Sequence, residues 1–192
     1  YNVFGPEQQP RTEAERLMQE GEEAVRAAPD SPDGHITLGM AYFDIGDYDR
    51  AEEEFETAEE LMDEAGVSTT IAEYNLAHVY RVTERHDESV DRLVVVVERE
   101  GDEGETAPDQ LFRDARYWLG VEYLRTGRAE QTIVALEPLL GGAPFDAEAA
   151  KVMAEAHESL GDAASARALY LRVLEVQPDD AEAAAGLERV GQ

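Results

Sequence analysis

Four five-residue segments of one pattern recur along the chain, and this repetition limits the possible folds more than any other feature of the sequence. Each segment starts with Leu or Met, continues with a small residue and ends with Tyr or His. The four copies are 38–42 (LGMAY), 76–80 (LAHVY), 119–123 (LGVEY) and 153–157 (MAEAH). They start 38, 43 and 34 residues apart, which indicates a 34-residue unit with insertions at 66–69 (GVST) and 104–112 (GETAPDQLF). Self-similarity at this period predicts a repeat array.

The residues that follow each segment repeat as well. A small or polar residue stands 13 positions after the leading one, a large residue 17 after and an apolar residue 20 after: Ala51, Ser89, Thr132 and Ala166; Phe55, Leu93, Leu136 and Tyr170; Ala58, Val96, Leu139 and Val173. Apolar spacings of three and four predict two amphipathic helices in each unit. We expect the turn between them at Gly46, Gly127 and Gly161, because glycine adopts the left-handed conformation at a helix C-terminus. The second unit has Glu84 there, so its turn is either strained or built differently.

This pattern resembles the tetratricopeptide repeat, a 34-residue helix-turn-helix unit with Leu-Gly, Tyr, Ala, Phe and Pro at these offsets. The resemblance covers about residues 32–180. The unit at 32–65 matches best, and the family's leading Trp is missing from every unit, where His35, Glu73, Arg116 and Ala150 stand instead. The resemblance implies an all-α, right-handed superhelical solenoid of antiparallel helix pairs. It also implies that the first helices line a concave groove and the second helices form the convex back.

We therefore expect seven segments. They are an extended linker at 1–12, a half repeat at 13–31, repeats at 32–65, 70–103, 113–146 and 147–180, and a capping helix at 181–192. In each repeat we expect the second helix to stop 25 positions after the leading residue, at Asp63, Gly101, Pro144 and Pro178. Small residues in the first helices (Gly39, Ala77, Gly120 and Ala154) allow the close approach that helix packing requires.

The charge of the chain is strongly negative. It has 44 Asp and Glu against 16 Lys and Arg, a net charge of −28, and its only lysine is Lys151. Such a field repels phosphate backbones and anionic lipid, so we expect no nucleic-acid partner and no binding to a membrane surface. Acidity together with loss of lysine is typical of proteins from salt-accumulating halophiles. The alternative is a GC-rich mesophile genome, in which codon usage replaces Lys by Arg.

No arrangement of residues typical of catalysis or cofactor binding occurs. The four histidines have no metal-binding spacing, there is no cysteine, and the phosphate-binding and nucleophile motifs GxGxxG, GxxxxGK and GxSxG are absent. The acidic stretch 101–105 (GDEGE) has oxygen ligands suited to Ca²⁺ but lacks the EF-hand order. We therefore expect no enzyme activity, no cofactor and no metal site.

Candidate binding residues follow from the concave face. Helical spacing places a mixture of apolar, aromatic and basic residues on the exposed side of the first helices: Ile36, Met40, Phe43, Tyr74, Asn75, His78, Arg81, Tyr117, Val121, Arg125 and Lys151. Aromatic residues with Arg are typical of interface hot spots. Of the adjacent Tyr117 and Trp118 we expect Tyr117 to be the contact and Trp118 to be buried or at the rim. Arg81 and Arg125 have an alternative role in ion pairs with Glu84 and Glu122.

Family members that hold chaperone C-termini use a clamp of Lys, Asn and Arg. At the corresponding positions this chain has Ile36, Met40, Asn75, Asp114 and Trp118, of which only Asn75 matches. We expect instead a non-catalytic scaffold that binds a peptide or helical segment of a partner protein in the groove. The alternative is a self-associating, possibly homo-oligomeric, or spacer module of a larger protein.

Localisation is not fixed by the sequence. No apolar stretch approaches the roughly 20 residues of a membrane span. The cytoplasm is the expected location. Tethering to the cell envelope is the alternative, because the chain starts with Tyr1 and a Pro-containing segment, as if something upstream had been removed.

Overall fold

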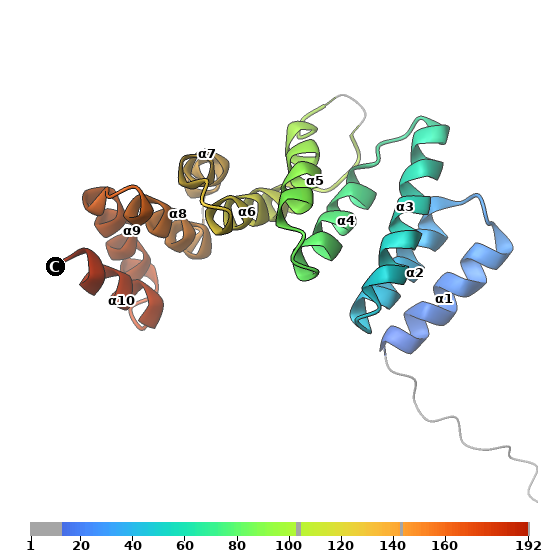
Figure 1. Ribbon diagram of the computed structural model, residues 1–192, viewed down its shortest axis with the longest axis horizontal. Coiled ribbons are helices and arrows are strands. Elements are labelled where there is room, and N and C mark those ends of the chain that lie inside the picture. Colours follow the sequence, from blue (N-terminus) through green and yellow to red (C-terminus); the bar gives the residue numbers. More distant parts are fainter. Residues whose placement is uncertain (1–12, 103–104, 143, 192) are drawn as a thin grey trace, which may run out of the picture. The chain divides into compact units, whose positions relative to one another are not determined.

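The chain folds into α-helices. The structure, a computed structural model, describes residues 13–102, 105–142 and 144–191, and in these residues it contains no strand. The helices in Figure 1 are α1 (Glu13–Ala27), α2 (Pro32–Asp44), α3 (Tyr48–Ala65), α4 (Thr70–Val82), α5 (His86–Glu98), α6 (Asp109–Arg125), α7 (Ala129–Leu140), α8 (Ala147–Ser159), α9 (Ala163–Val176) and α10 (Ala181–Val190). The expected linker 1–12 lies outside the described residues. None of the helices described is both long and apolar enough to cross a membrane.

The helices form two compact units, one ending at Thr83 and one beginning at Glu84. In the first unit each helix packs on the next, and α2 also contacts α4. In the second unit, α5 to α10 pack consecutively in the same way, and α8 also contacts α6 and α10. Within each unit, therefore, the first helices of successive pairs lie against one another.

The repeated positions form the core of both units. All twelve residues at the offsets 13, 17 and 20 are at most 2% exposed, from Ala51 and Phe55 in the first unit to Tyr170 and Val173 in the second. Residues three, four and seven apart share one face of a helix, so this spacing directs the side chains of each second helix into the core. The predicted pairs α2–α3, α6–α7 and α8–α9 are present, whereas the two helices of the predicted repeat 70–103, α4 and α5, belong to different units.

Two glycines allow the close helix contact within pairs. A Cβ atom on Gly39 would lie 2.6 Å from Cε1 of Phe55, and one on Gly120 would lie 2.5 Å from Cγ of Leu136. Neither distance is compatible with an alanine unless the partner side chain moves, so a small residue at this position is a packing requirement.

The turns between the paired helices follow the prediction. Gly46, Gly127 and Gly161 have φ values of +78°, +77° and +76°, the left-handed conformation that ends a helix. Glu84 takes the same place with φ +62° and is the only residue other than glycine with positive φ in the described part of the chain. Of the two alternatives for this turn, the strained one is therefore present.

Several helix boundaries differ from the prediction. Helix α5 ends at Glu98 and α7 at Leu140, before the expected stops at Gly101 and Pro144. Helix α6 begins at Asp109, so the last four residues of the insertion 104–112 are helical and the loop is shorter than expected. The extended conformation of Pro108 at the N-cap explains this start, because proline suits the beginning of a helix. Helix α3 continues past Asp63 to Ala65 and ends at Gly66 in the left-handed conformation.

Candidate functional site

A small cleft in the first unit brings together several of the predicted groove residues. It has a volume of about 170 Å³ and is formed by residues of α2 and α4 together with Phe55 of α3. We call it the α2–α4 cleft, lined by Met40, Phe43, Asp44, Phe55, Asn75 and His78. Met40 is 46% exposed and contributes apolar surface to this cleft. The cleft therefore presents an apolar wall to solvent beside one carboxylate and one amide.

Tyr74 and Arg81 both contact the ring of His78. The rings of Tyr74 and His78 meet edge to face with centroids 4.6 Å apart. The guanidinium of Arg81 lies 3.1 Å from Nδ1 of His78. Because a guanidinium has no acceptor, it donates this hydrogen bond and Nδ1 accepts it. The spacing of three and four residues along α4 places all three side chains on one face.

His78 is neutral at neutral pH. Burial, together with the positive charge of Arg81, lowers the pKa of His78 from 6.5 to about 4. The charge of the cleft therefore comes from the carboxylate of Asp44, which is an exposed residue. A ligand would meet an uncharged imidazole beside an acidic rim.

Ile36 does not belong to this surface. It is only 8% exposed and is part of the core cluster of the first unit with Phe55 and Leu76. The prediction that Ile36 faces the groove is therefore wrong. The physical reason is that α2 contacts three other helices, α1, α3 and α4. These neighbours cover more than one face of α2, including the face that carries Ile36.

The groove residues of the second unit form a separate group on α6 and α8. Tyr117 is half-buried, packs against the core cluster of Leu136 and Met153, and meets Trp118 edge to face at 5.1 Å. Trp118 is half-buried as well, which agrees with the expected position at the rim, and the expected contact role of Tyr117 stays a prediction. Burial raises the pKa of Tyr117, and the carboxylates of Glu148 and Asp146 raise it further.

Val121 is half-buried and Arg125 is exposed near the C-terminus of α6. The alternative that Arg125 pairs with Glu122 is wrong, because Oε2 of Glu122 bonds to His86 and Oε1 has no hydrogen-bond partner. Arg125 has no ion pair within the part of the chain that the structure describes. Its guanidinium is therefore accessible to an acidic group of a ligand.

Lys151 has a structural role in place of the expected binding role. It is 8% exposed, and its ammonium lies 3.1 Å from Glu148, 3.1 Å from Asp180 and 2.9 Å from Glu182. Burial alone would lower the pKa of Lys151, but hydrogen bonds to Glu182, Glu148 and Asp180 outweigh it and raise the pKa. Because Asp180 caps α10, the lysine fastens that helix to α8. It is already surrounded by carboxylates and does not offer a free cation to a ligand.

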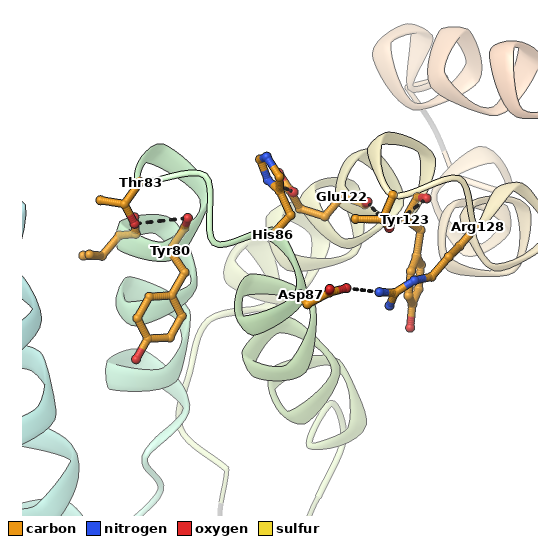
Figure 2. Close-up of polar contacts among 9 residues, drawn as sticks. Tyr80, Thr83, His86, Asp87, Glu122, Tyr123 and Arg128 are labelled. Carbon is orange, nitrogen blue, oxygen red and sulfur yellow. Dashed lines mark hydrogen bonds and ion pairs between the residues drawn. The ribbon is translucent and has the colours of Figure 1, made fainter.

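One buried polar pair was not predicted. His86 at the start of α5 and Glu122 on α6 lie side by side (Figure 2). Nδ1 of His86 donates to Oε2 of Glu122 at 2.8 Å, and the Glu122 side chain has no exposed surface. The residues at the same offset in the other units are Ala41, Val79 and Ala156, all completely buried. At this position of the repeat, Glu122 is thus acidic where the other three units have an apolar residue, and this difference in the sequence could have identified the pair.

No metal centre is found in the described residues, where no three His, Asp or Glu side chains are placed to hold an ion. The acidic stretch 101–105 includes residues 103 and 104, which lie outside the described part, so Ca²⁺ binding there is not tested.

Comparisons with known proteins agree with the repeat pattern. Residues 32–65 and 123–190 match models of the tetratricopeptide repeat. The chain therefore contains tetratricopeptide repeats, as its resemblance to this family implied. No curated protein matches the chain.

Several solved structures share the fold. The crystal structure of YrrB, described as a TPR protein with an unusual peptide-binding site, is 19% identical, with a TM-score of 0.74 over 92% of this chain and 84% of that one. The crystal structure of MamA is 19% identical, with a TM-score of 0.70 over 91% of this chain and 99% of that one. A MamA chain from Desulfovibrio magneticus RS-1 is 19% identical in sequence, with a TM-score of 0.72 over 88% of each chain. At this identity the likeness shows the fold and confirms the all-α class.

Proposed function

We propose that the chain is a non-catalytic interaction scaffold whose α2–α4 cleft binds an apolar side chain of a peptide or helical segment from a partner protein. The observation that carries this function is the cleft itself: Met40 and Phe43 from α2 face Asn75 and His78 from α4 across an open apolar hollow. Tetratricopeptide repeats support an interaction role, and one structure of the same fold is described as having a peptide-binding site.

The dimensions of the cleft suit a single anchor. An apolar cavity of about 150 Å³ holds a benzene ring, so a cleft of about 170 Å³ has room for one aromatic or branched aliphatic side chain. Anchors of this kind in a desolvated pocket contribute much of the energy of an interface. Asp44 at the rim would accept a hydrogen bond from the ligand, and the neutral His78 presents no charge against an apolar group.

In the second unit, Tyr117, Val121 and the accessible guanidinium of Arg125 are the corresponding candidates on α6. Arg125 would pair with an acidic group of the ligand. Ile36 and Lys151 have no part in the proposal, because one is in the core and the other is held by three carboxylates.

Selection of random peptides on the intact chain tests this function. Peptides that bind the cleft should bind the Met40→Glu variant at least tenfold more weakly, because a charge would replace the apolar wall. Val176→Glu is the matched control, since Val176 is also an exposed apolar residue, at 53%, and lies on α9. It should leave the affinity within twofold. Titration calorimetry measures both.

Failure to select any peptide, or equal binding by both variants, would contradict the proposal. Sedimentation equilibrium of the wild-type chain then decides whether the alternative function holds. A stable oligomer would indicate a self-association module, and a monomer would indicate a spacer.

A further inference from the structure

A second and larger cleft lies in the second unit, on the side formed by α5 and α7. It has a volume of about 340 Å³. We call it the α5–α7 groove. Its apolar surface consists of Val94 and Val97 on α5, Leu119 and Tyr123 on α6, and Val134 and Ala135 on α7. It shares no residue with the α2–α4 cleft or with the predicted groove residues, so it is a separate surface.

Helix α5 is apolar on two faces, and one of them opens into this groove. Val90, Leu93 and Val96 are at most 3% exposed and face the core of the unit. The neighbouring Val94 and Val97 are only half-buried and line the groove. A surface helix of a globular protein needs one apolar stripe, and a second stripe indicates a further partner. The run of apolar residues at 93–97 thus contains more hydrophobic surface than the core of this unit uses.

Across the groove, Val134 on α7 is 71% exposed, the highest value among the large apolar residues that the structure describes as exposed. Exposed apolar surface rimmed by polar groups marks an interaction site more often than a scattered single residue does. Val134 and the two valines of α5 line one continuous hollow with Leu119 beneath them.

The rim of the groove is acidic. Glu98 and Glu130 line it. The carboxylates of Asp91 and Glu98 interact electrostatically with the hydroxyl of Tyr123. Burial raises the pKa of Tyr123, and these two carboxylates raise it further against the opposing effect of Arg128. Asp91, Glu98 and Glu130 have no ion pair among the described residues.

Both arginines at the groove are already neutralised. Arg116 bonds to Glu100. Arg128 bonds to Asp87 beside the ring of Tyr123, as Figure 2 shows. Glu98 and Glu130 on the rim, with Asp91 close enough to affect Tyr123, therefore leave an uncompensated negative charge beside an apolar floor. A complementary ligand has the opposite charge at its edges and an apolar centre.

We propose that the α5–α7 groove binds a short amphipathic helix of a partner protein, with apolar side chains in the hollow and Lys or Arg against Asp91, Glu98 and Glu130. The lining residues of α6 extend from Arg116 to Tyr123, about two helical turns, which is the length of helix that the groove would receive. A second copy of this chain is a poor occupant, because its net charge of −28 opposes the same acidic rim.

Three synthetic helical peptides test the proposal by fluorescence anisotropy near physiological ionic strength. The first has Leu at i, i+3, i+4 and i+7 with Lys elsewhere, the second replaces Lys by Glu, and the third has the composition of the first with the Leu residues redistributed. We expect binding of the first peptide alone to be strong. Methyl NMR of the chain should show shifts at Val94, Val97 and Val134 and none at Val176.

Two pairs of variants separate groove binding from general attraction to an acidic protein. Val134→Asp should weaken binding of the Leu-Lys peptide about tenfold, whereas Val176→Asp should leave it within twofold. The triple variant Asp91→Asn, Glu98→Gln, Glu130→Gln should weaken it about tenfold. Its matched control removes three exposed carboxylates elsewhere in the unit, by Glu175→Gln, Asp179→Asn and Glu188→Gln, and should weaken it less than threefold.

Equal weakening by the two triple variants would overturn the proposal, because binding would then follow total charge. Equal affinity for the Leu-Lys and Leu-Glu peptides, or unchanged affinity in Val134→Asp, would overturn it too. A wild-type dimer that Val134→Asp converts to a monomer would assign the groove to a second copy. The outcome for Met40→Glu does not affect these results, so the two proposals fail independently.

Discussion

His86 donates a hydrogen bond of 2.8 Å to Glu122, a carboxylate with no exposed surface whose other oxygen, Oε1, has no hydrogen-bond partner in the structure. The bond joins the first turn of α5 to the last turn of α6 within the second unit. A buried carboxylate that depends on one donor is costly to strand, since its desolvation is no longer compensated when that donor is removed.

We therefore predict that His86→Ala lowers the free energy of unfolding by about 3 kcal/mol. The double variant His86→Ala, Glu122→Ala should cost less than His86→Ala alone, because it removes the stranded carboxyl group and introduces the alanine found at this offset in two other units. Urea unfolding followed by circular dichroism measures all of these variants. Additive losses would show that the two side chains do not interact.

The contact of Gly120 with Leu136 gives a second prediction. Gly120→Ala should lower the free energy of unfolding by about 1–3 kcal/mol through overpacking, although alanine favours a helix more than glycine does. The added Cβ would lie 2.5 Å from Cγ of Leu136, so the double variant Gly120→Ala, Leu136→Ala should lose less than the sum of the two single changes.

Gly141→Ala is the control for Gly120→Ala. A Cβ on Gly141 would meet its nearest neighbour, the carbonyl oxygen of Pro138, at 4.0 Å, so this substitution should be close to neutral in the same urea experiment. A loss at Gly141 as large as that at Gly120 would mean that general helix effects, and not the Leu136 contact, determine the result.

The sequence predicts the core of this fold well because the core depends on spacing. Residues 13, 17 and 20 positions after each leading residue share helix faces, and the structure buries all of them. The turns at Gly46, Gly127 and Gly161 follow for a similarly local reason, since only glycine takes positive φ without strain. The start of α6 was missed because the composition of its insertion suggested a loop, whereas Pro108 is a helix-start signal.

The candidate site is harder to predict, because spacing on one helix does not reveal which neighbours cover it. Met40 and Ile36 are one turn apart on α2, yet Met40 is 46% exposed and Ile36 is 8% exposed. Lys151 satisfies the spacing for the groove, but its three carboxylate partners include two from residues 29 and 31 positions later in the chain. Contacts of this range come from the packing of α10 and leave no local signal.

The neutral histidine of the α2–α4 cleft predicts a dependence of stability on pH. The pKa of His78 is about 4 in the folded chain and 6.5 when unperturbed, so between these values the unfolded chain binds more protons. Stability from this residue is therefore complete above pH 6.5 and falls as the pH decreases toward 4. The difference corresponds to at most roughly 3 kcal/mol.

His78→Gln is the control that isolates this contribution, because the many carboxylates titrate in both proteins. In urea unfolding, the wild-type chain should lose more stability than His78→Gln between pH 7 and pH 4. NMR titration of the His78 ring should give a midpoint near pH 4. A midpoint near 6.5 would contradict the prediction and would mean that the imidazole is protonated as readily as one in water.

The acidity of the chain, from which the sequence predicts a halophilic origin, leads to the last prediction. With a net charge of −28, carboxylates repel one another wherever they lie close together, and salt of about 1 M reduces the screening length to roughly 3 Å. Helix α3 has such a row on one face, since Glu53, Glu56, Glu60 and Glu64 are all exposed and three or four residues apart. Like charges at this spacing destabilise a helix.

We predict that the midpoint of thermal unfolding increases steeply with KCl. Changing these four glutamates of α3 to Gln should increase the midpoint at low salt and make its increase with KCl shallower, because the repulsion that salt screens would already be reduced. The same number of substitutions at uncharged exposed residues should do neither. A midpoint that stays constant or decreases with KCl in the wild-type chain would contradict halophilic adaptation and favour the alternative, in which codon usage accounts for the scarcity of lysine.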